Sequence, residues 1–383
     1  MKKLNILYIS HYSELNGANL SLLNLIDTLV KENKILPIIL IPEEGPLVEE
    51  VKRRNFKYYV IKFLSWEYQA EKFNKPRIFL LKHNLLNEIY YKNVLTILKK
   101  DKLKIDLIHS NSSVIDIGQY ISSELSIPHI WHLREFGKED YGLKYCISEK
   151  KVIRQYCKAT KLIAISKSIQ RYYENMIEGK EIELVYNGIP DTSYINNYNN
   201  EIVKICCVGL IHEKKNQMEI LAAIKILRDE NITNFKLYFI GSEDSEYREK
   251  MNGYVYKNNL EKYVEFMGRR ENVFEILTTM DVGVMPSLKE AFGRVTVEYM
   301  LAGLLTIGSN TGGTKEIIVD NKTGYLYEIG NTRQLADILK KTINDKDMRV
   351  SMGKHSKNYA LNTFGIKSTA DKVFNLYIKS IGK

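Results

Sequence analysis

The chain has 383 residues, of which 44% are hydrophobic and 27% are charged, and its formal net charge is +10. This composition is ordinary for a globular protein, and the length predicts two or three domains. The four cysteines show no C-x-x-C pair and no metal-ligand spacing, which argues against a disulfide framework and favours a reducing compartment.

The chain opens with an apolar run at residues 4–9 that resembles a signal peptide at first sight. The run is short, contains Asn5, and meets Ser10 and His11 without a small-residue cleavage site. It is therefore predicted to be the first β-strand. No apolar stretch approaches the roughly 20 residues that span a bilayer, so we expect a cytoplasmic protein, or one that is peripheral to the inner face of a membrane.

Short apolar runs then alternate with amphipathic helical stretches, which predicts an α/β fold with parallel sheets covered by helices. In the first half, strands are expected at 5–10, 35–41, 106–110, 128–133 and 161–165, and helices at 20–31 and 114–125.

A basic segment lies within this first half. Residues 51–104 hold 14 Lys and Arg against 4 Asp and Glu, a net charge of +10. Residues 76–100 are predicted to form a long helix with apolar positions at Leu80, Leu81, Leu85, Ile89, Leu95 and Leu98. Two interpretations fit the segment. Either it rests on an anionic membrane and collects a lipid-linked acceptor, or it is a core-facing helix with a solvated basic face.

Residues 191–201 are polar, rich in Asn and aperiodic, which predicts a linker. After it, strands are expected at 203–209, 235–240, 264–267, 282–286 and 305–308, with a helix at 217–228 and further helices between the strands. The domains predicted are 1–190, 202–365 and a terminal helical segment, 366–383. Two doubly wound sheets that face each other would form one deep cleft, because ligands bind beyond the carboxyl ends of the strands.

The stretch 285–316 holds the most informative group of candidate site residues. A strand is followed by a loop that carries Glu290 and Phe292, and Gly293 opens the next helix, so that backbone amides face an anion there. Glu298 lies two turns into that helix, on the same side of the expected cleft. Carboxylates accept several hydrogen bonds, as the hydroxyls of a sugar or a ribose require.

A second turn, Thr311-Gly312-Gly313-Thr314, follows the next predicted strand and leads into another helix. It exposes further amides to phosphate, and Glu316 comes close behind it.

These residues resemble the signature of the retaining glycosyltransferases of family four, which have the GT-B fold of two facing Rossmann-like domains. In the signature, an acid is followed eight positions later by a second acid, and then by a GG-x-x-E turn. Glu290 and Glu298 match the acids, and Gly312, Gly313 and Glu316 match the turn. The resemblance implies that Glu290 and the amides after it hold the transferred sugar, and that Glu298 holds the nucleotide ribose.

A second match follows the first strand of the second half. Gly209 lets the backbone approach a ligand closely, and Lys214 and Lys215 follow in a basic loop. In the family a lysine stands six places after this glycine, at Lys215, where it neutralises the diphosphate. Many members carry Arg directly after the glycine, whereas this chain has Leu210, which leaves the second phosphate cation unassigned. Arg294 is the candidate replacement for it, and a surface salt bridge is the equal alternative role of Arg294.

The resemblance implies further donor contacts where the strand at 264–267 ends. There the backbone of Met267 and Gly268 meets the nucleobase, although backbone contacts do not reveal which base. A UDP-sugar is expected ahead of a GDP-sugar as co-substrate, with no further cofactor and no metal.

The first half is expected to bind the acceptor, and the resemblance implies that the terminal helix, 366–383, packs back on this N-terminal domain. Gly17 resembles part of the family's first glycine loop, although Asn16 replaces the first glycine of the usual pair. His132 resembles the cleft histidine that touches the donor sugar or the acceptor, and a packed histidine at a strand end is the alternative. Arg134 and Glu135 are expected to contact acceptor groups. Ser166, Asn187 and Gly188 also match family positions, with roles in cleft geometry and hinge motion.

The implied reaction transfers a sugar from a nucleoside diphosphate to an acceptor hydroxyl with retention of configuration, in the assembly of a polysaccharide, a glycolipid or a glycoprotein glycan. Three alternatives stay open: a nucleotide-sugar epimerase of the same fold, a non-catalytic partner subunit of a glycosyltransferase, and a nucleic-acid-binding protein. The last lacks a reading motif, so no nucleic-acid partner is expected. The D-x-D at 345–347 is discounted as a metal site, and no zinc spacing, nucleophile elbow or P-loop occurs.

Overall fold

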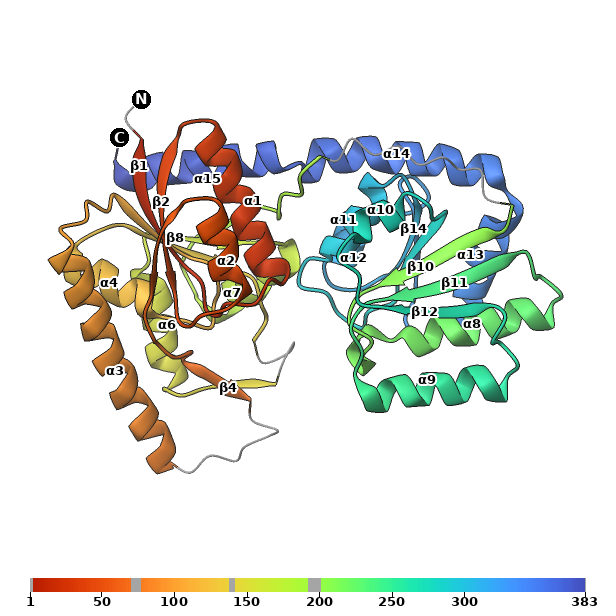
Figure 1. Ribbon diagram of the computed structural model, residues 1–383, viewed down its shortest axis with the longest axis horizontal. Helices are drawn as coiled ribbons and strands as arrows, with labels where there is room; N and C mark the ends of the chain where they lie inside the picture. The colour runs from red at the N-terminus through yellow and green to blue at the C-terminus, as the bar shows by residue number, and fades with distance from the viewer. Residues whose placement is uncertain (1–2, 70–76, 138–141, 192–200, 383) are drawn as a thin grey trace. The chain divides into compact units, whose positions relative to one another are not determined.

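In a computed structural model of the chain, residues 3–69, 77–137, 142–191 and 201–382 are described. The chain divides into two compact units (Figure 1). The N-terminal unit comprises Met1–Gly188 together with Ile366–Lys383, and the C-terminal unit comprises Ile189–Gly365. The predicted linker falls almost entirely on residues 192–200, which lie outside the described residues.

The N-terminal unit is built on a parallel sheet in the order β3-β2-β1-β5-β6-β8-β9. Its strands are β1 (Leu4–Ile9), β2 (Ile35–Ile41), β3 (Lys57–Val60), β5 (Leu107–Ser110), β6 (His129–Leu133), β8 (Lys161–Ala164) and β9 (Ile182–Leu184). A short antiparallel pair, β4 (Glu67–Gln69) and β7 (Leu143–Tyr145), lies apart from it. The order doubles back at β1, so consecutive strands lie on both sides of the first one, as in a doubly wound fold.

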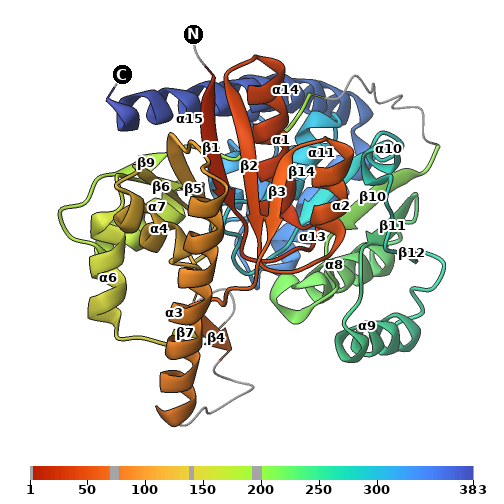
Figure 2. The same cartoon turned by 60° about the vertical axis from the view of Figure 1, so that its left-hand side comes forward.

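Helices cover both faces of this sheet (Figures 1 and 2). On one face α1 (Gly17–Lys31), α2 (Pro46–Arg53) and α15 (Ile366–Ile381) share a core with β1 and β2. On the other face α3 (Arg77–Lys100) and α4 (Ile117–Leu125) form a second core. The remaining described helices of the unit are α6 (Glu149–Lys158) and α7 (Lys167–Met176). The terminal helix α15 is thus part of the N-terminal unit and not of the unit that precedes it in the chain.

The C-terminal unit repeats the plan with a parallel sheet in the order β12-β11-β10-β13-β14-β15. Its strands are β10 (Val203–Val208), β11 (Phe235–Ile240), β12 (Val264–Gly268), β13 (Val282–Met285), β14 (Leu305–Ser309) and β15 (Tyr325–Tyr327). Its helices are η1 (Glu213–Lys215), α8 (Gln217–Asp229), α9 (Ser245–Lys257), α10 (Val273–Leu277), α11 (Arg294–Leu301), α12 (Thr314–Ile317), α13 (Thr332–Asn344) and α14 (Lys346–Phe364). The prediction of an α/β chain with two Rossmann-like sheets is confirmed.

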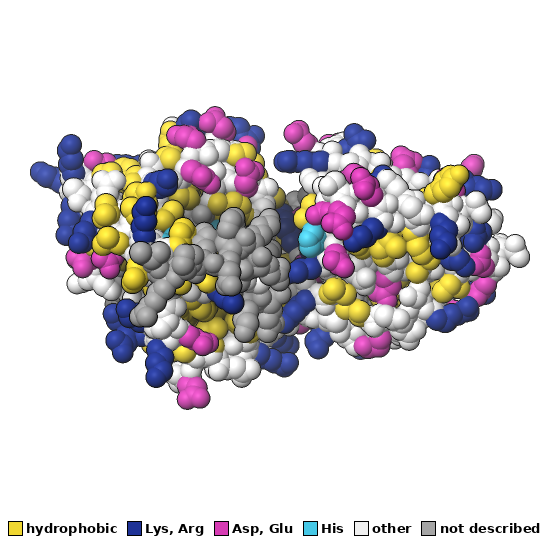
Figure 3. Space-filling model, turned by 90° about the horizontal axis from the view of Figure 1, so that it is seen from below, with side chains coloured by type: hydrophobic (Ala, Val, Ile, Leu, Met, Phe, Trp, Pro, Cys, Tyr) yellow, Lys and Arg dark blue, Asp and Glu magenta, His cyan; other side chains and the backbone are white. Residues whose placement is uncertain are grey.

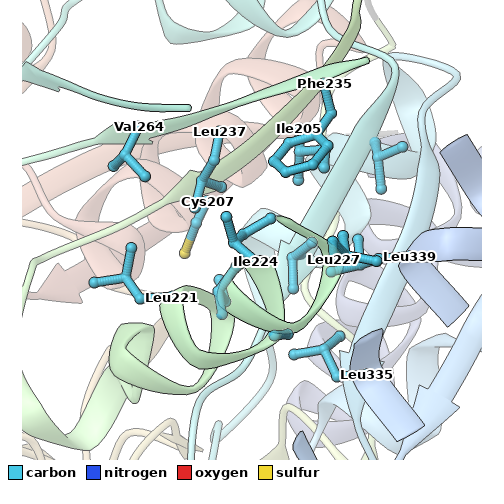
Figure 4. Packing of buried hydrophobic residues seen from close by; sticks show 14 of the residues in the cluster. Ile205, Cys207, Leu221, Ile224, Leu227, Phe235, Leu237, Val264, Leu335 and Leu339 are labelled. Carbon is cyan, nitrogen blue, oxygen red and sulfur yellow. The ribbon is translucent and has the colours of Figure 1, made fainter. Parts of the chain in front are cut away.

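The adjacent cysteines of β10 show why this strand is apolar from Ile205 to Val208. Cys207 points to the face covered by α8, α9 and α13, where it packs with Leu221 and Ile224 (Figure 4). Cys206 points to the opposite face, among side chains that include Leu277 and Tyr299 from α10 and α11. Since successive side chains of a strand alternate between faces, the part of a central strand that is covered on both sides is apolar on both faces.

Most of the predicted elements begin and end within one residue of their expected bounds, but two helices start elsewhere. α1 starts at Gly17 and not at residue 20, because the Asn16 side chain accepts a backbone N–H hydrogen bond from the first turn and caps the helix. α4 starts at Ile117 and not at residue 114. The Val114 carbonyl oxygen accepts a hydrogen bond from the backbone N–H of Trp66, so it is not used in a helical hydrogen bond.

The long helix α3 is buried on one side only. Tyr91, Val94 and Leu98 are 5%, 0% and 2% exposed and pack on the sheet, whereas three other apolar residues of the helix are open to solvent. These are Leu81, Leu85 and Ile89, with exposed fractions of 63%, 61% and 55%. The expectation of a core-facing helix therefore holds for one side and is wrong for the other. Among the described residues, no helix is both long enough and apolar enough to cross a bilayer.

Candidate functional site

In the C-terminal unit, the loops after β10, β13 and β14 meet, because these strands are neighbours in the sheet and end at the same edge. Nζ of Lys215, from the turn after β10, donates a hydrogen bond of 2.5 Å to Oε1 of Glu290, from the loop after β13. The Leu288 N–H donates to the carbonyl oxygen of Lys214 at 3.1 Å and ties the same loops together. The fold therefore brings together two predicted site residues that are 75 positions apart.

Gly312 and Gly313 pack on the backbone of the Glu290 loop. The Gly313 N–H donates to the Glu290 carbonyl oxygen at 2.7 Å. A Cβ added at Gly312 would lie 2.5 Å from that oxygen, and a Cβ at Gly313 would lie 2.2 Å from the carbonyl oxygen of Phe292. Both distances are far below van der Waals contact, so glycine at both positions is what allows the loops after β13 and β14 to touch.

Gly293 ends the Glu290 loop and caps α11 with a positive φ of 94°, a conformation that glycine adopts without strain. A Cβ at Gly293 would have the hydroxyls of Thr296 and Thr314 3.3 Å and 3.6 Å away. Both hydroxyls are buried, and neither has a hydrogen-bond partner in the part of the chain that the structure describes. A helix start together with two unpaired hydroxyls is a suitable place for an oxygen-rich ligand such as a phosphate or a sugar.

Arg294 and Glu298 form an ion pair one turn apart on α11. Arg294 Nε lies 2.8 Å from Glu298 Oε1, and the side chains are 20% and 18% exposed. A surface salt bridge was the alternative role predicted for Arg294. The structure shows a salt bridge, but its two side chains are half-buried and not on the open surface. Of the other residues predicted to bind the donor, Glu316 is half-buried on α12 and Lys214 is exposed beside Lys215.

A cavity of about 240 Å³ lies at the carboxyl ends of β10, β11 and β12. Two glycines with positive φ line it, Gly209 at 142° and Gly241 at 154°, and the Gly241 N–H donates to the carbonyl oxygen of Gly268 at 3.0 Å. A Cβ at Gly241 would lie 2.0 Å from the Gly209 carbonyl oxygen, so this crossing of backbones requires glycine. The rest of the lining is Val208, Leu210, Ile240, Ser242, Arg269, Arg270 and Val273.

Only part of this cavity lining was predicted from the sequence. Gly209 was predicted, as was Gly268, which does not line the cavity but accepts the Gly241 N–H beside it, whereas Gly241 and Arg270 were not predicted. Gly241 directly follows a predicted strand, and a glycine in that position could have been recognised as a candidate site residue. The Met267 side chain lines a different cavity, of about 350 Å³, together with residues that include Lys204 and Tyr238, so the structure does not bring this side chain to Gly209.

In the N-terminal unit, buried polar side chains surround Arg134 just after β6. Arg134 donates from Nε to Oδ1 of Asn111 at 2.8 Å and from Nη1 to Oδ1 of Asn187 at 2.6 Å. Its Nη2 lies 3.3 Å from Nδ1 of His132. His132 also approaches His109, whose Nε2 lies 3.2 Å from His132 Nδ1. Two predicted residues, His132 and Arg134, are thus in contact, while His109 and Asn111 were not predicted.

Burial and the charge of Arg134 disfavour the cationic form of the histidines near this arginine. Burial holds the pKa of His132 and of His109 well below the ordinary value, and the positive charge of Arg134 lowers both further. Burial, with a smaller contribution from Arg134, lowers the pKa of His11 to about 3. Around neutral pH these rings therefore act as hydrogen-bonding groups and not as cations.

Glu135 and Gly17 occupy different surroundings from His132. Ser112 Oγ donates to Oε1 of Glu135 at 2.9 Å, and the N–H and Oγ of Ser113 donate to Oε2 at 3.1 Å and 2.9 Å. Burial raises the pKa of Glu135 even though these hydrogen bonds lower it. Glu135 therefore orders the loop after β5, and Gly17 is the exposed first residue of α1. Their contact with an acceptor stays a prediction.

A second buried carboxyl group, that of Glu67 on β4, was not predicted. Burial, and secondarily the charge of Glu135, raise the pKa of Glu67 to about 8. Its Oε2 atom has no hydrogen-bond partner among the described residues. Within those same residues, no group of three or more His, Cys, Asp and Glu is placed to hold a metal ion.

Comparison with known proteins agrees with this architecture. Residues 192–359 match the sequence model of the family described as glycosyl transferases group 1. An uncharacterized glycosyltransferase of Methanocaldococcus jannaschii, MJ1178, is 30% identical over 263 residues, which cover 67% of this chain and 70% of that protein. The UDP-Gal:alpha-D-GlcNAc-diphosphoundecaprenol alpha-1,3-galactosyltransferase of Escherichia coli is 24% identical over 74% of this chain and 78% of its own.

Among solved structures, Anabaena HepE in complex with UDP superposes with a TM-score of 0.81. The similarity covers 98% of this chain and 100% of that one at 17% sequence identity, a level at which the likeness concerns the fold. The fold is the GT-B fold that the sequence predicted.

Proposed function

This chain belongs to the glycosyl transferases group 1, and on that premise we propose that it transfers a sugar from a nucleoside-diphosphate sugar to an acceptor hydroxyl with retention of configuration. The observation that carries the proposal is the contact between Lys215 and Glu290, next to the buried hydroxyls around Gly293. A cation, a carboxylate and a helix start within one set of loops suit a sugar diphosphate, which carries negative charge at one end and hydroxyls at the other.

Each group has a role in this proposal. Lys215 neutralises the charge that grows on the diphosphate as the glycosidic bond breaks. Glu290 accepts hydrogen bonds from the hydroxyls of the transferred sugar, and its ion pair with Lys215 keeps both groups in place before the donor binds. Glu298 accepts hydrogen bonds from the ribose, oriented by Arg294. His132 contributes a buried ring nitrogen from the N-terminal unit.

We further propose a UDP-sugar as the donor and no bound metal or other cofactor. The UDP assignment rests on relatives: HepE was solved with UDP, and the Escherichia coli relative is named for UDP-Gal. Metal independence rests on charge, since Lys215, the start of α11 and the arginines of the 240 Å³ cavity supply positive potential where a metal ion would otherwise be needed. Relatives in Staphylococcus aureus are named for capsular polysaccharide biosynthesis, which favours a glycan product.

A panel of nucleotide sugars, with UDP and GDP alone, tests the donor site by thermal shift. A ligand that binds only the folded chain raises the melting temperature, and UDP compounds are expected to do so by several degrees in EDTA. Lys215→Ala should abolish the shift, whereas Lys257→Ala, which removes an exposed lysine at the end of α9, should keep it. No shift with any nucleotide, or equal shifts in both variants, would contradict the proposal. Turnover of the donor with no acceptor present would favour an epimerase.

The acceptor is proposed to be lipid-linked and presented at an anionic membrane, on which α3 rests. Leu81, Leu85 and Ile89 stand four positions apart and form one exposed apolar stripe along the helix. Exposed Lys82 and Lys92 flank it, within a segment of net charge +10. Figure 3 shows lysine and arginine side chains around exposed apolar ones on the face of the N-terminal unit that is in view. Basic residues next to an apolar stripe complement an anionic bilayer, and the Escherichia coli relative is named for a diphosphoundecaprenol-linked acceptor.

Sedimentation with phosphatidylglycerol vesicles and with phosphatidylcholine vesicles tests this surface. Binding is expected to the anionic vesicles only, to weaken with salt, and to fall about tenfold in the double variant Leu85→Ser, Ile89→Ser. Tyr256→Ser, which removes an exposed aromatic side chain from α9 of the other unit, is the control and should bind normally. Absence of binding to anionic vesicles at low salt, or unchanged binding in the double variant, would reject the proposal that α3 rests on a membrane.

A further inference from the structure

A chain of buried hydrogen bonds runs from the C-terminal helix to His132. Oη of Tyr377, on α15, lies 2.6 Å from Nδ1 of His109 on β5, and Nε2 of His109 lies 3.2 Å from Nδ1 of His132 on β6. Oη of Tyr8 lies a further 3.3 Å beyond Tyr377. All four side chains are at most 2% exposed. Water therefore does not compete for these contacts, and each polar atom depends on its protein neighbour.

The charged neighbour of this chain fixes the direction of its hydrogen bonds. A guanidinium group only donates, so Nδ1 of His132, which lies 3.3 Å from Arg134 Nη2, must be the acceptor of that contact. An imidazole nitrogen that accepts carries no proton. The proton of neutral His132 is therefore on Nε2.

The same reasoning extends to His109. Since Nδ1 of His132 has no proton, the 3.2 Å contact needs a proton on Nε2 of His109. Nδ1 of His109 is then an acceptor as well, and the donor within reach of it among the described residues is the hydroxyl of Tyr377, whose one proton points along the shorter, 2.6 Å contact. The Tyr8 hydroxyl then donates to Oη of Tyr377 across the 3.3 Å contact. The three groups thus form one consistent series, in which each donates to the next and His132 is the last.

We propose that His109 and Tyr377 are positioning residues that hold His132 with its proton on Nε2, so that His132 acts in the transfer reaction as a neutral hydrogen-bond donor and not as a base. The Nε2 atom of His132 is buried and has no partner among the described residues. The Nε2–H group is the last donor in this chain of hydrogen bonds, and it can donate to an oxygen atom of a bound substrate. The role in the reaction rests on the proposed function, whereas the position of the proton does not.

Protein labelled with ¹⁵N at histidine provides a test that needs no substrate. From pH 6 to pH 8, His132 and His109 should each show an unprotonated Nδ1 and a protonated Nε2, with no titration, because burial and Arg134 disfavour the cation. The variants His132→Asn and His109→Gln assign the signals. A proton on Nδ1 of either ring, or a charged His132 within this range, would overturn the proposal.

Kinetics then separate positioning from simple structural support. His109→Leu removes the donor to His132 and should lower kcat about tenfold with little change in KM for the donor. His109→Gln, whose side-chain amide can still donate to His132, should recover most of the loss. Tyr377→Phe should lower kcat in the same way, whereas Tyr156→Phe should not, since its equally buried hydroxyl donates to the Ser113 carbonyl oxygen instead.

Equal kcat values for the Leu and Gln variants would reject the positioning role. If the ¹⁵N spectra agree with the series but no nucleotide sugar is consumed, the proposed function fails while the assigned proton positions stand.

Discussion

The Cβ atom that an alanine would place at Gly313 lies 2.2 Å from the carbonyl oxygen of Phe292. The loop after β14 thus packs directly on the backbone of the loop after β13, where the carbonyl oxygen of Glu290 accepts the Gly313 N–H. The paired glycines therefore have a structural reason that is separate from any contact with phosphate. Changes at Gly313 should act on stability as well as on the donor site.

Gly313→Ala is expected to destabilise the chain by about 2 kcal/mol, because its backbone φ of −68° suits alanine but its Cβ does not fit. The matched control is Gly253→Ala, in the middle of α9, where a Cβ meets no atom within 4 Å. That change should stabilise the chain by about 0.5–1 kcal/mol, since alanine favours helices. Urea unfolding of both variants provides the measurement, and a neutral Gly313→Ala would show that the loops separate easily.

Glu290 and Glu298 should differ in their effect on the reaction. Glu298→Ala is expected to weaken donor binding about tenfold, because the ribose loses a charged hydrogen-bond acceptor. Glu290→Ala should mainly lower kcat, by about a hundredfold, since it removes the partner of Lys215 at the reacting sugar. Donor affinity by calorimetry and turnover by product formation test both, with the exposed Glu261→Ala as control. If both substitutions left affinity and turnover unchanged, neither assigned role would survive.

Leu210→Arg should strengthen donor binding. Leu210 is 47% exposed and lines the same cavity as Gly209, Arg269 and Arg270, so a guanidinium there would add a cation directly after Gly209. An increase in UDP affinity of about fivefold at low salt is expected from one further charge-assisted hydrogen bond. Leu210→Gln, similar in size but uncharged, should leave affinity close to the original. Equal affinity of the Arg and Gln variants would show that the position does not face the phosphates.

Glu67 should make stability depend on pH. Its pKa is about 8 in the folded chain against a reference value of 4.5, so the folded state holds a proton that the unfolded state releases. Stability from this group is complete below pH 4.5 and is lost as pH rises through 8, at up to about 1.4 kcal/mol per pH unit. Glu67→Gln has nearly the shape of the protonated Glu67 side chain but cannot ionise, so it should remove this loss of stability. The free energy of unfolding of the variant should therefore rise relative to that of the original chain from pH 5 to pH 8.5.

Urea midpoints at several pH values measure this effect, with the exposed Glu88→Gln as control. A constant difference between Glu67→Gln and the original chain across this range would mean that Glu67 is ionised in the folded state.

The sequence alone determined the two parallel sheets, most of their strand limits and the donor-side motif. Strands buried on both faces are largely apolar runs, and helices repeat their apolar residues every three to four positions, so both patterns are local properties. β4, β7, β9 and β15, each with three residues, escaped prediction because so short a run has no readable period. The acids at Glu290 and Glu298 were found because their spacing is itself a local pattern.

Only the tertiary structure decided which of these residues touch. Periodicity shows that a side chain is buried but not what it is buried against, so the contact between Tyr377 and His109, which are 268 positions apart, left no trace in the sequence. The crossing of Gly241 over Gly209 and the exposed side of α3 were hidden for the same reason. The order of the strands and the placement of the helices determine which side chains are neighbours. Those neighbours determine which ring nitrogen of His132 carries the proton, and whether a Cβ fits at position 313.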